Sequence, residues 1–432
     1  MAADVRKLID DGRLTGVQFG VFLICLIMNM LDGMDVMVIS YSSNALTADW
    51  GISGTELGVV FSAALFGMSL GALFLGPVAD VIGRRAMVMI AILVMGLGVF
   101  LTAHTHTITE LVVLRFLSGL GIGAMLASTA TLASEYAPNR VKNLIVSIVL
   151  SGYPIGATLS GLVASHVIPE YGWRTMFHVA GIISLATLPF AWFFMSESLD
   201  WLTKKQPKQA LGKLNRILDR MGHDHMELLP PLPEEAKKNP LSTLFKSGRT
   251  MMTIQLWVAF FLAFATLYYL TAWIPKLAGG GSPAGTLGIY AGTAFNLGAV
   301  FGIWTQGWLS LKIGLRRSVI LFFILTAVLM IAFDFFQGET IILLVFGIIG
   351  YGVQGGFIGM YSMAGRAYPT EMRSAGIGGA IGAGRVGAVI SPIFAGYLAD
   401  WNWSITAQFL FFSVPILVVC VSIWMLRSKD ID

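Results

Sequence analysis

Long apolar runs alternate with short polar segments along almost the whole chain. Each run contains about 20 mostly apolar residues, which is the length that a helix needs to cross a bilayer. The first six runs lie near residues 18–40, 56–79, 86–104, 109–133, 143–166 and 175–195. The second six lie near residues 251–274, 285–309, 318–336, 340–364, 374–398 and 404–426. The pattern predicts an all-α membrane protein with twelve transmembrane helices.

One long polar segment divides these runs into two sets of six. We therefore expect an N-terminal six-helix bundle over residues 1–195, a linker over 196–250 and a C-terminal six-helix bundle over 251–432. Within the linker, Lys and Arg recur at helical spacing over residues 204–220, which predicts an amphipathic helix along the membrane surface. Residues 1–13 are polar and charged and do not have the pattern of a cleavable signal peptide.

The composition agrees with a membrane-embedded chain. Only 12% of the residues are charged and 56% are hydrophobic, whereas soluble proteins carry about 25% charged residues. A soluble enzyme, a nucleic-acid-binding domain and a disordered scaffold are excluded. The two cysteines, Cys25 and Cys420, lie inside apolar runs, so we expect neither a disulfide nor a metal site. We expect no cofactor, and no Gly-Lys-Ser/Thr loop indicates ATP-driven transport.

The basic residues indicate an orientation. All but four of the 28 Lys and Arg residues lie in segments that share one side with the linker and both ends of the chain. The exceptions are Arg115, Arg174, Lys276 and Arg385. Because Lys and Arg stay on the cytoplasmic side of short loops, we expect both termini and the linker to be cytoplasmic. The net charge of +4 is therefore a topology signal, not evidence of a nucleic-acid partner.

The two halves repeat each other. Three pairs of landmarks share one and the same separation along the chain, namely Gly76 and Gly307, Gly83 and Gly314, and Pro138 and Pro369. The glycines bound the polar turns that we expect between helices 2 and 3 and between helices 8 and 9. The repeat predicts two pseudo-symmetric bundles, an arrangement found in many secondary transporters.

Several motifs carry a family resemblance. The turn at residues 76–85 resembles the loop signature of the major facilitator superfamily, Arg115 with Gly119, Gly121 and Gly123 resembles its helix 4 motif, and residues 196–202 resemble the helix 6 exit of sugar-porter-like members. The sequence Asp32-Gly33-Met34-Asp35 resembles the Asp-Gly-x-Asp signature of the aromatic acid:proton symporter family. Residues 368–373 and 384–387 also resemble that family. The resemblance covers essentially the whole chain.

Two positions depart from the family pattern. Leu311 stands where the duplicated loop often has Asp, so we expect the second gate to be weaker or differently paired. Within the fifth predicted helix, residues 152–156 lack the Gly-Pro pair of the antiporter signature. This absence favours symport over drug/proton exchange.

Asp32 and Asp35 are the candidate proton-coupling residues. Intramembrane charges usually face a cavity or a partner, and the i,i+3 spacing puts both carboxylates on one face of the first helix. Two neighbouring carboxylates in a low dielectric resist double ionisation, so one is expected to bind a proton reversibly. The alternative is a structural pair, in which one Asp is held permanently by an arginine.

Arg115 and Arg385 are the candidate intramembrane cations. Arg115 and Asp35 lie at similar depths, so they can form a pair, although Arg115 can equally brace two helices. Arg385 is flanked by Gly384 and Gly387, which would let a helix or a ligand come close. Its guanidinium fork matches a carboxylate, so we expect a substrate anchor. The alternative is that Arg385 pairs with an aspartate of the first helix or with backbone carbonyls.

An aromatic acid also needs an apolar slot with a few polar groups. Beside the two arginines, the candidate substrate-binding residues are Tyr351, Gln354, Tyr361, Asn296 and Tyr269. Trp273, next to Pro275, is predicted to lie in the interfacial aromatic belt.

A further set of charged and glycine residues lies at the predicted cytoplasmic ends of helices. We expect these residues to brace an inner gate: Gly76, Asp80, Gly83, Arg84, Arg85, Glu135, Arg140, Glu371 and Arg373.

The family resemblance implies a function. It implies a monomeric carrier in the bacterial inner membrane that takes up an aromatic carboxylate together with protons by alternating access. A symporter of a sugar or a non-aromatic organic acid, a drug/proton antiporter and a transporter-like receptor are the alternatives.

Overall fold

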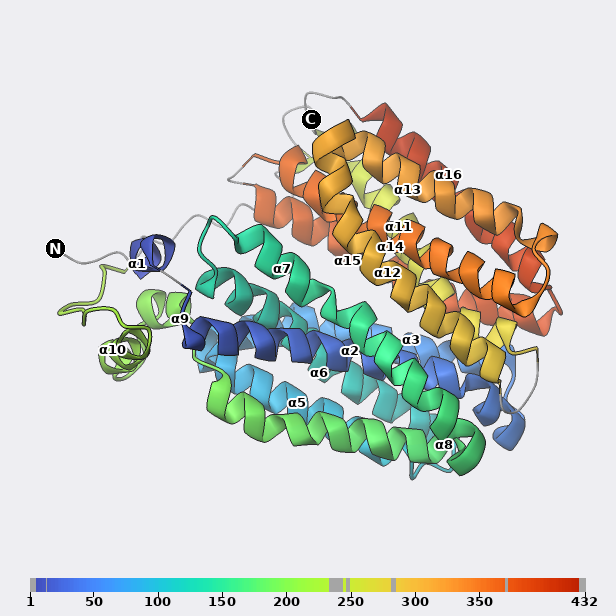
Figure 1. Ribbon diagram of the computed structural model, residues 1–432, viewed down its shortest axis with the longest axis horizontal. Coiled ribbons are helices and arrows are strands. Elements are labelled where there is room, and N and C mark those ends of the chain that lie inside the picture. Colours follow the sequence, from blue (N-terminus) through green and yellow to red (C-terminus); the bar gives the residue numbers. More distant parts are fainter. Residues whose placement is uncertain are drawn as a thin grey trace.

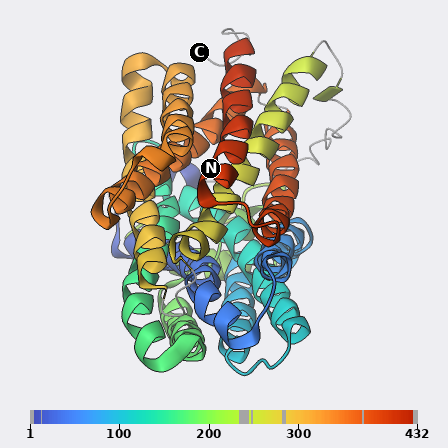
Figure 2. The same ribbon diagram turned by 90° about the vertical axis from the view of Figure 1, so that its right-hand side faces the viewer.

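The computed structural model describes residues 5–12, 14–232, 244–245, 249–280, 285–369 and 372–426, and this part of the chain is helical without a strand. The first bundle contains α2 (Gly16–Trp50), α3 (Gly54–Leu70), α4 (Gly76–Ile82), α5 (Arg84–Thr102), α6 (Ile108–Tyr136), α7 (Lys142–Leu150) and α8 (Gly152–Phe194). The second bundle contains α11 (Thr250–Ala278), α12 (Thr286–Ile313), α13 (Leu315–Ile331), α14 (Glu339–Ala367), α15 (Arg373–Asp400) and α16 (Ile405–Met425). Figures 1 and 2 show the two bundles as separate groups that lie against each other.

These helices make twelve membrane crossings. Ten helical segments of the described chain are long and apolar enough to span a bilayer. The segment 142–194 is 53 residues long and contains two crossings, because the chain turns back at Gly172, where φ is 80° and ψ is 166°. Helix α13 has 17 residues, which is the lower limit for a crossing, and it packs between α14 and α16. The prediction of an all-α membrane protein with twelve crossings in two bundles is confirmed.

The turns between helices 2 and 3 and between helices 8 and 9 are shorter than the sequence predicted. A π-helical segment at Gly71–Leu75 connects α3 to α4, and the helix continues to Ile82. Pro77 stands just after the π-helical segment, in the first turn of α4. Gly83 alone turns the chain, with φ at 99°, and Gly314 does the same in the second bundle, with φ at 88°. Each of these two equivalent turns therefore consists of a single glycine.

Glycines let the helices of the first bundle touch backbone to backbone. A Cβ on Gly33 of α2 would lie 1.9 Å from the carbonyl oxygen of Tyr153 on α8, and a Cβ on Gly156 would lie 1.9 Å from that of Met30. Gly119 and Gly123 of α6 meet α3 in the same way, 2.1 Å from its carbonyl oxygens. Without a hydrophobic driving force in lipid, such small residues allow the close packing that holds helices together.

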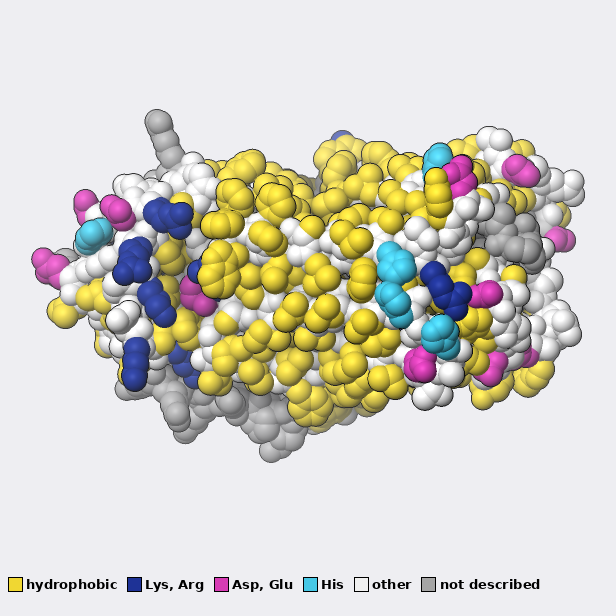
Figure 3. All heavy atoms as spheres, turned by 90° about the horizontal axis from the view of Figure 1, so that it is seen from below, with side chains coloured by type: hydrophobic (Ala, Val, Ile, Leu, Met, Phe, Trp, Pro, Cys, Tyr) yellow, Lys and Arg dark blue, Asp and Glu magenta, His cyan; other side chains and the backbone are white. Residues whose placement is uncertain are grey.

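Three short helices form a small cluster at one end of the molecule, which we call the linker end, and we call the opposite end the far end (Figure 1). Helices α1 (Val5–Asp11), α9 (Leu199–Lys204) and α10 (Ala210–Arg220) lie there. Leu214 and Leu218 on the apolar side of α10 are completely buried by protein. The expectation that this side lies on the membrane is therefore wrong. Figure 3 shows Lys and Arg gathered at the linker end and a hydrophobic band around the middle.

Candidate functional site

A cavity of about 380 Å³ lies between the two bundles. It extends from the middle of the molecule toward the linker end, since its walls include Leu126 and Ala130 from that half of α6 and Tyr361 from that half of α14. Most of the lining is apolar or aromatic. The polar residues in the wall are Asn29, Asp32, Tyr153, Tyr268, Thr271, Gln354, Tyr361 and Arg385. An apolar pocket with a few convergent polar groups is typical of a small-molecule site.

Asp32 and Arg385 bring opposite charges into this cavity from different bundles. Asp32 on α2 is 2% exposed, and it interacts electrostatically with Arg385 on α15. Tyr153, Tyr268 and Tyr361 also lie close enough to Arg385 to interact electrostatically with it. The arrangement places one guanidinium among three phenol rings and one carboxyl group.

Three buried polar atoms of residues in the cavity wall have no hydrogen-bond partner within the described protein. They are Oδ1 of Asp32, Nη1 of Arg385 and Oε1 of Gln354. A buried polar group without a partner is costly, so such atoms are normally satisfied by water or a ligand. The wall residues thus leave one donor and two acceptors unpaired, and all three atoms are buried in this state.

The glycines beside Arg385 admit a neighbouring helix. A Cβ on Gly384 would lie 2.4 Å from the Phe264 ring, and a Cβ on Gly387 would lie 2.2 Å from the carbonyl oxygen of Phe261. Both phenylalanines belong to α11, which therefore packs directly on α15. The Phe264 ring also lies 5.8 Å from the Arg385 guanidinium, within reach of a cation–π contact.

Asp35 is occupied by Arg115. Nη1 of Arg115 donates to Oδ1 of Asp35 at 2.8 Å, and Nη2 donates to Oδ2 at 3.1 Å and to the Asp35 carbonyl oxygen at 3.1 Å. Both side chains are completely buried. The Asp35–Arg115 pair that the similar depths of the two residues made possible is thus present in the structure. This pair leaves Asp32 as the aspartate of α2 that faces the cavity. It also keeps Arg115 out of the cavity wall.

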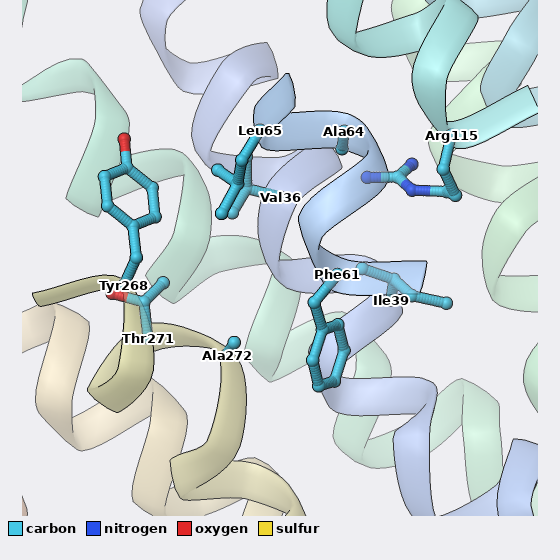
Figure 4. Close-up of a pocket in the computed structure, with 9 residues that line it drawn as sticks. All are labelled: Val36, Ile39, Phe61, Ala64, Leu65, Arg115, Tyr268, Thr271 and Ala272. Atoms are coloured by element: carbon cyan, nitrogen blue, oxygen red, sulfur yellow. The ribbon is translucent and has the colours of Figure 1, made fainter. Parts of the chain in front are cut away.

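The cavity ends toward the far end at Tyr268 and Thr271. Beyond these two residues lies a space of about 10 Å³, roughly enough for one water molecule. Figure 4 shows Arg115 on one side of this space and Tyr268 on the other, with Val36 and Leu65 between them. A substrate cannot pass through so narrow a space in this state.

The far end is closed by contacts between the bundles. Ser40 donates to the carbonyl oxygen of Thr271 at 3.2 Å, and Asn44 donates to that of Pro275 at 3.0 Å. Each of these pairs joins positions that are 231 residues apart, so the contacts mark the pseudo-symmetry axis. Ser62 adds a hydrogen bond to the Val389 carbonyl oxygen at 2.6 Å. These three contacts between the bundles all lie in the far-end half of the molecule.

Not every candidate substrate residue lies in the cavity wall. Gln354, Tyr361 and Arg385 line it, whereas Tyr351, Asn296, Tyr269 and Arg115 do not. Tyr269 stacks on Phe412 with ring centroids 3.8 Å apart, Asn296 donates to the carbonyl oxygen one turn earlier, at Gly292, and Tyr351 packs against Phe322. Tyr269 and Tyr351 thus pack against other helices of the second bundle.

Two other predictions are changed by the structure. Trp273 is 1% exposed, and its ring centroid lies 5.7 Å from that of Phe61 in the first bundle, so it lies at the bundle interface and the prediction of an interfacial belt residue is wrong. Asn29 lines the cavity one turn before Asp32 and was not predicted as a site residue. Its i,i+3 spacing to Asp32 was the signal for it.

The predicted gate residues form a network within the first bundle. Nη1 of Arg84 lies 2.9 Å from Oε1 of Glu135, and Nη2 lies 3.6 Å from Oδ1 of Asp80. The carboxylate of Glu197 accepts hydrogen bonds from the backbone N–H groups of Arg84 and Arg85, at 2.9 and 3.1 Å, and thereby caps α5. The sequence indicated Glu197 only as part of the helix 6 exit.

The remaining gate candidates have different positions. Gly76 starts α4 and Gly83 ends it, so both belong to the turn region between helices 2 and 3. Arg140 donates to the Gly12 carbonyl oxygen at 3.2 Å. Arg373 is exposed at the start of α15, and Glu371 lies outside the described residues.

Two six-helix bundles that repeat each other, with a charged cavity between them that is closed at one end, define a multi-pass membrane carrier. The sequence pattern of the Major Facilitator Superfamily matches residues 25–303 and 278–430, and the chain belongs to this superfamily.

Relatives of known name are aromatic acid transporters. The chain is 30% identical to the 4-hydroxybenzoate transporter PcaK of Acinetobacter baylyi, over 98% of this chain and 94% of the relative. It is 27% identical to the gallate transporter of Pseudomonas putida, over 97% of this chain and 94% of the relative.

Solved structures of other carriers have the same fold. The inward-open structure of the xylose transporter XylE from E. coli is 18% identical, with a TM-score of 0.74 over 96% of this chain and 98% of that one. The bacterial homologue of the human lysosomal transporter Spinster, in its inward-facing and unoccupied conformation, is 14% identical, with a TM-score of 0.70 over 95% of this chain and 96% of that one. At these identities the likeness concerns the fold alone.

Proposed function

We propose that this protein takes up aromatic carboxylates of the hydroxybenzoate type together with protons, by alternating access. The observation that carries the proposal is that Asp32 and Arg385, one from each bundle, line the same aromatic cavity, which is closed at the far end. The names of the relatives support the aromatic carboxylate as the substrate class.

Arg385 binds the substrate carboxylate in this proposal. Its guanidinium offers a donor without a partner, and a bidentate carboxylate matches its fork. The phenol rings of Tyr153, Tyr268 and Tyr361 surround it and provide the aromatic walls for the ring of the substrate. Gln354 supplies an acceptor for a donor group on the substrate.

Asp32 couples the substrate to the proton. An ionised Asp32 competes with the substrate carboxylate for Arg385, and a protonated Asp32 does not. Proton binding therefore favours substrate binding, and release of the proton on the other side favours release of the substrate. The Asp35–Arg115 pair holds α2 against α6 and carries no proton in this scheme.

The linker end faces the cytoplasm in the proposed orientation. Lys and Arg gather at this end, as they do on the cytoplasmic side of membrane proteins (Figure 3). Both termini are then cytoplasmic, the membrane is a bacterial inner membrane, and the described state is open inward. The outward-open state requires the bundles to rock apart at the far end.

Uptake of labelled 4-hydroxybenzoate into proteoliposomes with an imposed inward proton gradient tests the proposal. We expect gradient-dependent accumulation by the wild type and none by Asp32→Asn. Accumulation that persists in Asp32→Asn would contradict the coupling role of Asp32. An absence of uptake by folded wild-type protein would contradict the substrate class, and uptake of labelled xylose or cis,cis-muconate would then indicate a sugar or a non-aromatic acid.

A further inference from the structure

The last residue of α15, in the second bundle, caps the first turn of α3, in the first bundle. Oδ1 of Asp400 accepts a hydrogen bond from the backbone N–H of Gly54 at 2.6 Å, and Oδ2 accepts one from that of Thr55 at 2.8 Å. The Thr55 hydroxyl donates a third hydrogen bond to Oδ2. One carboxylate thus joins the two bundles at the far end through three hydrogen bonds.

The chemistry of this contact suits a carboxylate. The first N–H groups of a helix have no partner within the helix, and the helix dipole gives its N-terminus a partial positive charge. Charge-assisted hydrogen bonds of this kind are about twice as strong as neutral ones. The contact is also exposed at the surface of the far end, so it forms and breaks in water without burying a bare charge.

The backbones of α3 and α15 touch beside this contact. A Cβ on Gly396 would lie 2.4 Å from the Gly54 carbonyl oxygen, and a Cβ on Gly58 would lie 2.5 Å from that of Pro392. Ser62 continues the same face of α3 toward the cavity. The two helices cannot separate at the far end unless Asp400 releases α3.

Helix α3 has a cap of its own. The Ser53 side chain accepts from the Glu56 N–H at 3.1 Å, and the Glu56 carboxylate accepts from the Ser53 N–H at 2.8 Å. This capping box lies wholly within the first bundle and pairs the N–H groups of Ser53 and Glu56, whereas the N–H groups of Gly54 and Thr55 find their acceptor in the second bundle. Asp400 therefore completes the cap of α3, and because it belongs to α15 it also links the two bundles.

We propose that Asp400 is a latch that holds the far end closed by capping α3 across the bundle interface. The repeat does not duplicate the latch, since the position of the first bundle that is equivalent to Asp400 holds Pro169, which has no carboxylate. Loss of the latch shifts the carrier toward the state that is open at the far end. The inference rests on the rocking of the bundles in the proposed function, and it does not depend on the substrate or on proton coupling.

The opening of the far end can be measured with two spin labels. Thr109, at the start of α6, and Thr340, at the start of α14, are exposed, remote from Asp400 and equivalent in the two bundles. The double variant Thr109→Cys/Thr340→Cys is labelled in a background in which Cys25 and Cys420 are replaced by Ser. Double electron–electron resonance in liposomes without substrate then gives the distance distribution across the far end.

Four variants in this background test the latch. We expect Asp400→Ala to raise the ratio of far-end-open to closed molecules by at least about threefold, a change typical of losing a carboxylate at a helix N-terminus. Asp400→Asn, which keeps one acceptor, and Thr55→Val, which removes one donor, should each give a smaller shift in the same direction. The matched control Glu56→Ala removes the carboxylate of the internal cap and should leave the ratio unchanged.

Two results would overturn the latch. The first is an unchanged distribution in Asp400→Ala, and the second is an equal shift in Asp400→Ala and Glu56→Ala, which would reflect the stability of α3 alone. Failure of the proposed function is recognised separately, because it would remove uptake from the unlabelled wild type while the response of the distances to Asp400→Ala persists.

Discussion

Arg115 and Asp35 belong to different helices of the first bundle. The guanidinium of Arg115 donates hydrogen bonds to both the carboxylate and the backbone carbonyl of Asp35. Neither side chain is exposed. A charge in such a place is tolerated only with its partner, because removing one member leaves the other buried and unpaired. The pair therefore makes a sharp prediction about stability.

Asp35→Asn and Arg115→Gln should each lower the free energy of unfolding by about 3–5 kcal/mol, the usual cost of breaking a buried ion pair. The double variant should lose less than the sum of the two single losses, because no unpaired charge remains. Thermal unfolding of the four proteins in detergent gives the coupling energy as a double-mutant cycle. Additive losses would show that the two side chains do not depend on each other.

Asp32→Asn should separate substrate movement from proton coupling. An amide cannot exchange a proton, so accumulation driven by a proton gradient should be lost while exchange of labelled for unlabelled substrate continues. Both activities are measured in the same proteoliposomes. Asp49→Asn, which changes an exposed aspartate at the far end of the same helix, serves as the control and should retain both. Loss of exchange in Asp32→Asn would mean that Asp32 binds the substrate itself.

Arg385→Lys should raise the half-saturation concentration for uptake by about tenfold or more. Lysine keeps the charge but loses the fork, and a hydrogen bond to a charged group contributes about 1.5–3 kcal/mol. Initial uptake rates over a range of substrate concentrations measure the effect. Arg220→Lys on the exposed side of α10 is the matched substitution and should leave the kinetics unchanged. Wild-type kinetics in Arg385→Lys would remove Arg385 from the substrate site.

Gly33→Ala should destabilise the protein by at least about 1–3 kcal/mol, the usual cost of overpacking. The new methyl group would lie 1.9 Å from a backbone oxygen of α8, which cannot move aside as a side chain could. Gly307→Ala is the control, because nothing lies within 4 Å of a Cβ there and alanine favours a helix. The melting temperatures of the two variants should therefore move apart. Equal melting temperatures would contradict the backbone contact.

The helices and the repeat could be predicted from the sequence, because each of these patterns can be recognised without knowledge of the packing. A sufficiently long apolar run must cross the bilayer whatever its neighbours are. The repeat, visible in Gly83 and Gly314, returns in the structure as two single-residue turns with nearly the same dihedral angles. The extent of the turns was not predictable, since Gly76, Pro77 and Asp80 are typical of a turn and are also compatible with the start of a helix.

The cavity wall was harder to predict because it depends on how far each helix is rotated about its axis. Tyr268 and Tyr269 are neighbours in the sequence, but Tyr268 lines the cavity and Tyr269 stacks on Phe412 behind it. A weak hydrophobic asymmetry around a membrane helix gives little sign of which face points inward. Charged residues were the exception, as Asp32 and Arg385 had to face a cavity or a partner at their depth.

The two intramembrane charge pairs respond differently to any rigid-body motion of the bundles. Arg115 and Asp35 move as parts of the same bundle, so their separation stays constant. Their interaction energy is therefore the same in every arrangement of the two bundles. Asp32 and Arg385 belong to different bundles, so a change of the angle between the bundles changes the distance between these two side chains. The electrostatic interaction between these two residues is thus a function of that angle, and it changes without any helix having to bend.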